Sequence, residues 1–218
     1  MKGDDKFPFG YVALDQSTAA NIQQGILRYT YRGLPMLKCP FDLALYMQVI
    51  WDVKPRTIIE FGSRAGGSAL WIADLLTNFG LKETVLRSYD IEPVVSLKDP
   101  RIAFLKVDVS APQNFIGEAE LSTLPRPMLI IDDASHRYSD VLTLLKFLHP
   151  HLRPGDYLIV EDGIVDRLGL TGFDGGPLRA IREFLATYSE LYQVDRKRCD
   201  AFGRNMTWNV EGYIQRVA

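Results

Sequence analysis

The sequence predicts an α/β fold built on a doubly wound, mostly parallel sheet with helices on both faces. Apolar segments of strand length alternate with segments whose apolar residues recur at helical spacing. A glycine-rich loop, residues 62–67, joins the first expected core strand to a helix, as in nucleotide-binding folds. Two later strands end abruptly in carboxylates, at Asp132-Asp133 and at Glu161-Asp162. This alternation indicates parallel strands joined by right-handed crossovers.

The expected elements follow in chain order, within one domain of residues 1–218. Residues 1–40 form an N-terminal helical arm, and residues 41–218 form the Rossmann-like core. The core opens with a helix that begins at Asp42 and ends before Lys54-Pro55. Expected strands are 57–61, 85–91, 102–107, 127–131 and 156–160, and expected helices are 68–78, 138–148 and 177–188. A terminal pair of strands closes the chain.

The amino-acid composition limits the classes of protein to which this chain can belong. The chain is 47% hydrophobic and 24% charged, which is ordinary for a globular protein and argues against extended disorder. Its formal net charge of -2 offers no general attraction for nucleic acid or anionic membranes, and no apolar run is long enough to span a bilayer. Cys39 and Cys199 lack metal-ligand spacing, so we expect reduced thiols and a cytoplasmic location.

The glycine loop and three strand ends indicate a cofactor site. Glycines such as Gly62 and Gly66 allow close backbone approach to a ligand, yet the loop is not the Gly-x-Gly-x-x-Gly dinucleotide fingerprint. The acid that precedes it, Glu60, would repel a pyrophosphate and attract an ammonium, so S-adenosylmethionine fits better than NAD. Asp90 and Asp108 end the next two strands, where a ribose diol and an adenine edge would lie, although each alone could be a helix cap. The expected cofactor residues are Glu60, Gly62, Ser63, Gly66, Ser68, Asp90, Asp108 and Asp132.

The other two acid-tipped strands indicate a metal site with a base beside it. Carboxylates gathered at one sheet edge repel one another, and Mg²⁺ (or Mn²⁺) would neutralise them. We expect Asp133, Glu161 and Asp162 to be the ligands. Strand alternation leaves open whether Asp132 or Asp133 is the first ligand; we favour Asp133, with Asp132 nearer the cofactor. His136 is positioned as a general base for a hydroxyl proton.

Five segments in order resemble the cephalosporin hydroxylase-like family. That resemblance implies the class I methyltransferase fold and S-adenosylmethionine-dependent O-methylation of sugars and natural products. The metal acids are also similar to those of catechol O-methyltransferases, in which a lysine occupies the base position that His136 takes here. Residues 207–213 depart from the family's C-terminal Asn-Pro-Asn-Gly-Tyr pattern. The five segments are residues 31–42, 59–70, 133–136, 158–162 and 176–185.

We therefore expect a Mg²⁺- and S-adenosylmethionine-dependent O-methyltransferase that acts on a hydroxyl of a sugar, an oligosaccharide or a glycosylated natural product. The alternatives are a metal-dependent hydroxylase of a natural product and a non-catalytic S-adenosylmethionine-binding module. The expected partner is a small-molecule or oligosaccharide acceptor, with no nucleic acid and no membrane, and a homo-oligomer, a dimer above all, is favoured. The glycine-rich segment 169–176 is either a lid over the acceptor or a surface loop.

Overall fold

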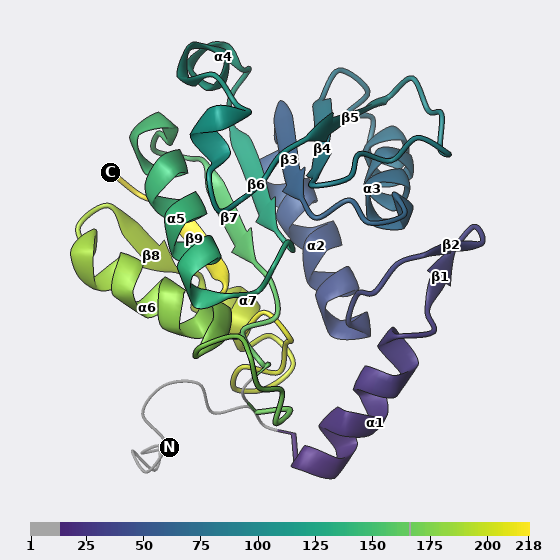
Figure 1. The fold of residues 1–218 in the computed structure, drawn as a ribbon, viewed down its shortest axis with the longest axis vertical. Helices are drawn as coiled ribbons and strands as arrows, with labels where there is room; N and C mark the ends of the chain where they lie inside the picture. The colour runs from purple at the N-terminus through teal and green to yellow at the C-terminus, as the bar shows by residue number, and fades with distance from the viewer. Residues whose placement is uncertain (1–13, 166) are drawn as a thin grey trace.

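The computed structural model describes residues 14–165 and 167–218, and its centre is a seven-stranded sheet (Figure 1). The strand order is β5-β4-β3-β6-β7-β9-β8. Strands β3 to β7 pair in parallel, and β9 runs antiparallel to both β7 and β8. The prediction of a doubly wound, mostly parallel sheet is confirmed. The strands are β3 (Thr57–Phe61), β4 (Val85–Asp90), β5 (Ile102–Lys106), β6 (Met128–Asp132), β7 (Tyr157–Val160), β8 (Tyr192–Val194) and β9 (Tyr213–Arg216).

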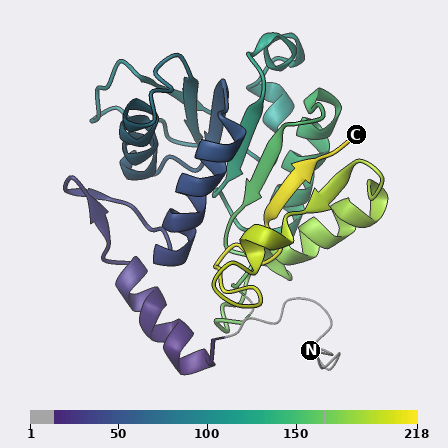
Figure 2. The same cartoon turned by 180° about the vertical axis from the view of Figure 1, so that it is seen from behind.

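Helices cover both faces of this sheet, with α5 in front of it in Figure 1 and α2 in front of it in Figure 2. In the described ranges, none of the helices is long and apolar enough to cross a membrane. The α-helices are α1 (Gln16–Ile26), α2 (Pro40–Val53), α3 (Gly67–Asn78), α4 (Glu118–Thr123), α5 (Tyr138–Leu148), α6 (Gly176–Thr187) and α7 (Arg196–Cys199), with short 3-10 turns η1 (Pro112–Asn114) and η2 (His149–His151).

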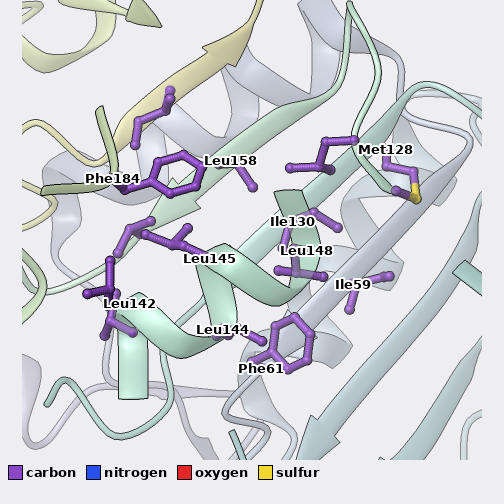
Figure 3. Packing of buried hydrophobic residues seen from close by; sticks show 14 of the residues in the cluster. Ile59, Phe61, Met128, Ile130, Leu142, Leu144, Leu145, Leu148, Leu158 and Phe184 are labelled. Carbon is purple, nitrogen blue, oxygen red and sulfur yellow. The ribbon is translucent and has the colours of Figure 1, made fainter. Parts of the chain in front are cut away.

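Alternation along the strands divides the core into two apolar layers. In β3, Ile58 packs into the layer under α2 and α3, whereas Ile59 and Phe61 point into the layer under α5 and α6. Figure 3 shows the second layer, where Phe61, Leu144 and Leu145 lie among fully buried side chains. Burying each such side chain contributes roughly 1.5–3 kcal/mol. The same alternation directs Glu60 toward the α2 side.

The N-terminal arm packs beside the core. It holds α1 and a short hairpin of β1 (Thr30–Tyr31) and β2 (Leu34–Pro35), which the sequence did not predict. The Tyr31 hydroxyl donates to Asp74 Oδ2 on α3 at 2.9 Å, and Trp208 Nε1 donates to Gln23 Oε1 on α1 at 2.7 Å. The arm therefore has fixed contacts with the core. Three tyrosines of the arm are expected either to stack on a sugar face or to pack at a subunit interface: Tyr11, Tyr29 and Tyr31. The first of them lies outside the described residues.

Chain order creates a crevice at one edge of the sheet. From β3 the chain moves outward to β4 and β5 and then returns to β6 on the other side of β3. In open α/β sheets, ligands bind at the carboxyl ends of the strands beside such a reversal. The glycine loop after β3 and the Asp132-Asp133 pair at the end of β6 both lie at this point.

Candidate active site

A cavity of about 970 Å³ opens at this edge of the sheet. Its wall includes residues from the loops after β3, β4, β5 and β6, together with part of the N-terminal arm and the loop before α6. Of the residues expected at a site, Glu60, Gly66, Asp132 and Glu161 are absent from the lining. Those that line the cavity are Gly62, Ser63, Ser68, Asp90, Asp108, Asp133, His136 and Asp162.

Two acids on the β4 and β5 side are held by local hydrogen bonds. Asp90 Oδ2 accepts the backbone N–H of Arg64 at 2.7 Å, so the acid also fixes the glycine loop. Asp108 Oδ1 accepts the hydroxyl and the backbone N–H of Ser110, and these bonds lower the pKa of Asp108. Both acids line the cavity. Their contacts with a ribose and an adenine remain a prediction.

The two loop glycines, Gly62 and Gly66, have different structural roles. Gly62 has φ +103°, and a Cβ there would lie 2.1 Å from the carbonyl oxygen of Asp133, so only glycine allows this approach of β3 to β6. Gly66 has φ +82° and precedes α3 as its N-cap. It belongs to the turn that starts the helix and lies outside the cavity wall.

Glu60 lies beneath the cavity. Its side chain is fully buried, and Oε2 accepts the Ser88 hydroxyl at 2.5 Å; Ser88 in turn shares a hydrogen bond with Ser63 at 2.6 Å. Burial raises the pKa of Glu60, and the positive charge of Lys38 opposes that shift. Hydrogen bonds through the Ser88 hydroxyl thus link Glu60 to Ser63, which lines the cavity. Direct contact of Glu60 with a ligand ammonium stays a prediction.

Three of the expected side chains converge on one point. One ligand atom each from Asp133, His136 and Asp162 lies within 4.8 Å of the others. His136 Nε2 is 3.4 Å from Asp162 Oδ2 and 3.8 Å from Asp133 Oδ1. The Asp133 and Asp162 carboxylates suit a hard divalent cation and His136 lies beside them as the expected base, so the residues present fit the metal that the sequence predicts. Asp132 is buried, 5% exposed, and lies outside this group.

Glu161 has other partners. Its Oε1 accepts Lys38 Nζ at 2.5 Å and also accepts the Tyr46 hydroxyl. Lys38 Nζ lies 2.5 Å from Asp133 Oδ2 as well, so one ammonium bridges two of the predicted metal acids. Burial lowers the pKa of Lys38, but the Asp133 and Glu161 carboxylates more than offset this and raise it. Lys38 therefore stays charged.

Sequence reasoning missed Lys38 and Tyr46. Both lie in or near the segment 31–42 that carries the family resemblance, but a single lysine in an arm and a tyrosine at a buried helix position give no sign of a role. The only available signal was indirect: three acids at one sheet edge need a counter-charge, and a lysine before α2 can supply it.

The C-terminal segment supports the acid pair after β7. The backbone N–H of Asp162 donates to Asn209 Oδ1 at 3.2 Å, and Asp162 has a left-handed backbone with φ +56°. Asp42 on α2 accepts the Trp208 N–H and the Tyr213 hydroxyl, each at 2.9 Å. The departure from the family pattern at residues 207–213 thus falls in a segment that supports the Asp162 turn and lies outside the cavity wall.

Asp162 and the glycine-rich segment complete the wall. Burial raises the pKa of Asp162 to about 6, and the neighbouring His136 opposes the shift. Leu170 and Phe173 line the cavity, and the Phe173 ring meets the His136 ring edge-on at 6.1 Å. Segment 169–176 therefore borders the expected base, and closure as a lid remains a prediction.

Comparison with known proteins identifies the family. A family model described as Rhamnosyl O-methyltransferase/CmcI matches residues 23–217. The chain belongs to this family. The resemblance to cephalosporin hydroxylase-like methyltransferases is confirmed, and so is the enzyme class of O-methyltransferase.

Curated relatives and solved structures agree with this membership. A rhamnosyl O-methyltransferase of Mycobacterium leprae is 32% identical over 193 residues, which is 86% of this chain and 82% of the relative. One from Mycobacterium tuberculosis (strain ATCC 25618 / H37Rv) is 31% identical over 182 residues, 80% of this chain and 73% of the relative. A structure of CmcI with Mg and S-adenosylmethionine has a TM-score of 0.66 at 25% identity, covering 88% of this chain and 78% of its own. Another with S-adenosylhomocysteine has a TM-score of 0.67 at 25% identity, covering 100% and 96%. The class I methyltransferase fold is therefore confirmed.

Proposed function

We propose that this family member transfers a methyl group from S-adenosylmethionine, with Mg²⁺, to a hydroxyl of a sugar in a glycosylated natural product. The observation that carries the proposal is the convergence of Asp133, His136 and Asp162 in the same cavity as Asp90 and Asp108. The cofactor pair agrees with the CmcI structures, which contain Mg and S-adenosylmethionine or S-adenosylhomocysteine. The sugar acceptor is supported by the rhamnosyl O-methyltransferases among its relatives.

The two halves of the cavity suit the two cofactors. Gly62, Ser63 and Ser68 with Asp90 and Asp108 would hold S-adenosylmethionine. Asp133, Asp162 and Glu161 would hold Mg²⁺, with His136 beside them as the base. When bound, S-adenosylmethionine supplies an electrophilic methyl group and Mg²⁺ makes a nearby hydroxyl more acidic.

The chain's own residues then govern the proton and the geometry. His136 Nε2 accepts the hydroxyl proton, and Asp162, with Oδ2 at 3.4 Å, orients the imidazole and stabilises its protonated form. Leu170 and Phe173 give this end of the cavity an apolar lining. A positioned base contributes roughly 10²–10⁴-fold, and holding the reactants in line can contribute about 7–11 kcal/mol.

The hydroxylase alternative lacks support from the donor set. The group in the described residues contains one histidine and two carboxylates. Non-haem iron oxygenases use two histidines and one carboxylate. His149, the next histidine along the chain, stacks on Tyr188 at 3.9 Å between ring centroids, and neither it nor His151 lines the cavity.

The test is methyl transfer from labelled S-adenosylmethionine to a panel of rhamnosylated acceptors and their non-glycosylated cores. We expect label on the glycosides only, with loss of transfer in EDTA and recovery on adding Mg²⁺. His136→Ala should lose transfer, while His151→Ala, a matched histidine outside the cavity, should keep it. Label on none of the glycosides despite tight cofactor binding would favour a non-catalytic module, and full transfer in EDTA would remove the metal from the proposal.

Assembly and location remain proposals of the same kind. We infer a homodimer, which sedimentation of the purified protein would test directly. Trp51 and Met47, one turn apart on α2, are 53% and 41% exposed and give an apolar surface for such a contact. The absence of a nucleic-acid partner and the cytoplasmic location rest on composition alone.

A further inference from the structure

Asp162 carries its carboxylate on a turn that strand geometry does not fix. Strand β7 ends at Val160, two residues earlier, so the pleat of the strand no longer sets the direction of the side chain. Asp162 has φ +56°, a left-handed backbone that residues other than glycine seldom adopt. Such a conformation persists where the surrounding structure holds it. Contacts from outside β7 therefore keep Asp162 Oδ2 at 3.4 Å from His136 Nε2.

Asn209 supplies one such contact. Its side chain is fully buried, and Oδ1 accepts the backbone N–H of Asp162 at 3.2 Å. The other end of the amide is also engaged, since Nδ2 donates to the Tyr213 hydroxyl at 3.3 Å. That hydroxyl donates in turn to Asp42 Oδ1 at 2.9 Å. Because a backbone N–H can only donate, the amide must present its oxygen to the turn, and the Tyr213 hydroxyl holds it in that orientation.

The segment that carries Asn209 is itself fixed against the loop after β7. The Val160 N–H donates to the Gly212 carbonyl at 2.9 Å, and the Ile164 N–H donates to the Trp208 carbonyl at 3.1 Å. A Cβ at Gly212 would lie 2.0 Å from the Val160 carbonyl oxygen, so the two backbones are in close contact. These bonds lie on either side of the left-handed turn. The Asn209 side chain therefore reaches the turn from a rigid support.

Residues at the start of α2 support all three expected metal acids. Lys38 lies just before the helix, and Asp42 and Tyr46 follow it at intervals of four residues. Lys38 Nζ is 2.5 Å from Asp133 Oδ2 and 2.5 Å from Glu161 Oε1. The Tyr46 hydroxyl donates to the same Glu161 oxygen. Asp42, between the two, supports the third acid through the buried chain of hydrogen bonds described above.

We propose that Asn209 is a positioning residue, which fixes the turn at Asp162 and so directs its carboxylate to the divalent cation and to the His136 imidazole. The inference rests on the proposed function, which gives the carboxylate a metal to bind. Without the Asn209 oxygen, the Asp162 N–H would lose its partner, and the turn would relax to recover one. Asn209 thus acts on the reaction through Asp162, from a position outside the cavity wall.

The first test measures Mn²⁺ affinity by electron paramagnetic resonance in the wild type, Asn209→Ala and Asn205→Ala, well below the Tm of each protein. Residues that orient a metal ligand change metal affinity by about 10–100-fold, so we expect a loss in this range for Asn209→Ala. Asn205 is the matched control, a buried asparagine of the same segment with φ +48° that lies outside the cavity wall. Asn205→Ala should lower Tm and leave the Mn²⁺ affinity unchanged. Unchanged affinity in Asn209→Ala, equal losses in the two variants, or no Mn²⁺ binding by the wild type would overturn the proposal.

A second variant, Tyr213→Phe, keeps the Asn209 oxygen and removes only the hydroxyl that orients the amide. Its loss of Mn²⁺ affinity should be smaller than that of Asn209→Ala. Hydrogen exchange of a peptide covering residues 161–165, followed without added metal, reports the turn directly. Exchange should be faster in Asn209→Ala than in Asn205→Ala, because only the first variant removes the acceptor of the Asp162 N–H. Affinities that follow Tm across the three variants, with equal exchange, would mean that Asn209 only stabilises the fold.

Methyl transfer is measured separately in the same preparations. Magnesium-dependent transfer by the wild type, together with unchanged Mn²⁺ affinity in Asn209→Ala, would leave the proposed function standing and reject the positioning role. Weaker Mn²⁺ binding in Asn209→Ala, without transfer to any acceptor by the wild type, would support the positioning role and reject the proposed function.

Discussion

Replacing Asp133 with asparagine removes a charge from both a buried ion pair and the metal group. Asp133 is paired with Lys38, and the two side chains are 19% and 2% exposed, so solvent screens the pair little. Removing one partner of a buried pair costs about 3–5 kcal/mol. Because Glu161 also contacts Lys38, at 2.5 Å, we expect the lower end, about 3 kcal/mol. For a chain of this size that is a fall in Tm of roughly 6–12 °C.

The assay pairs thermal unfolding with a Mn²⁺ titration, and Asp132→Asn is the matched control. Metal affinity should fall by at least about 100-fold in Asp133→Asn, because a charged ligand is lost. Burial raises the pKa of Asp132 to about 6, so its ionised form is disfavoured in the folded protein. A neutral side chain there removes that penalty at pH 7, and Asp132→Asn should keep both its metal affinity and its Tm.

Two results would refute this reasoning. Unchanged metal affinity in Asp133→Asn would exclude Asp133 as a ligand. Loss of affinity in Asp132→Asn, with Asp133→Asn unaffected, would transfer the role to the residue that strand alternation left as the alternative.

The remaining predictions concern the base, the crevice and the acidity of the site. His136→Gln should lower turnover by roughly 10²–10⁴-fold while S-adenosylhomocysteine affinity measured by calorimetry stays the same; parallel losses of both would point to a structural role. Gly62→Ala places a Cβ 2.1 Å from a backbone oxygen at φ +103°, whereas Gly155→Ala has φ +93° with open space, so urea unfolding should show about 1–3 kcal/mol more destabilisation for Gly62→Ala. Equal losses of stability in the two variants would mean that the positive φ, and not the contact of the added Cβ, causes the destabilisation. Because the pKa of Asp162 is raised to about 6, protons should compete with Mn²⁺ below that pH. Affinity should then rise with pH up to about 6 and level off, and a profile in Asp162→Asn as steep as in the wild type would contradict this.

Sequence reasoning succeeded where local chemistry decides structure. The helix expected at 138–148 is α5 (Tyr138–Leu148), and the strand expected at 57–61 is β3 (Thr57–Phe61). The helical spacing of apolar residues indicated the helix, and a short apolar run bounded by turn residues indicated the strand. It missed the β1–β2 hairpin, whose strands have two residues each, too few for a periodic pattern. The helix expected from Asp42 begins instead at Pro40, a residue suited to the first turn of a helix.

The same distinction applies to the site. Acids at strand ends were predictable, since parallel strands must bring their carboxyl ends to one edge. Alternation also directed Glu60 into the sheet's α2 face, where its Oε2 accepts the Ser88 hydroxyl. That its carboxylate is joined to the cavity wall only through the Ser88 and Ser63 hydroxyls follows from tertiary packing, which the spacing of residues does not encode.

By itself, the sequence determined a parallel α/β core, a glycine turn at its reversal point and an edge rich in acids, because each follows from periodicity, backbone sterics or strand direction. Only the tertiary structure decided how those acids are shared. Asp162 lies beside His136, Glu161 pairs with Lys38, a residue far away in the chain, and Asp133 contacts both. Which counter-charge pairs with a buried acid depends on distance in space. Lys38 comes close to Glu161 only after the arm has packed against the core.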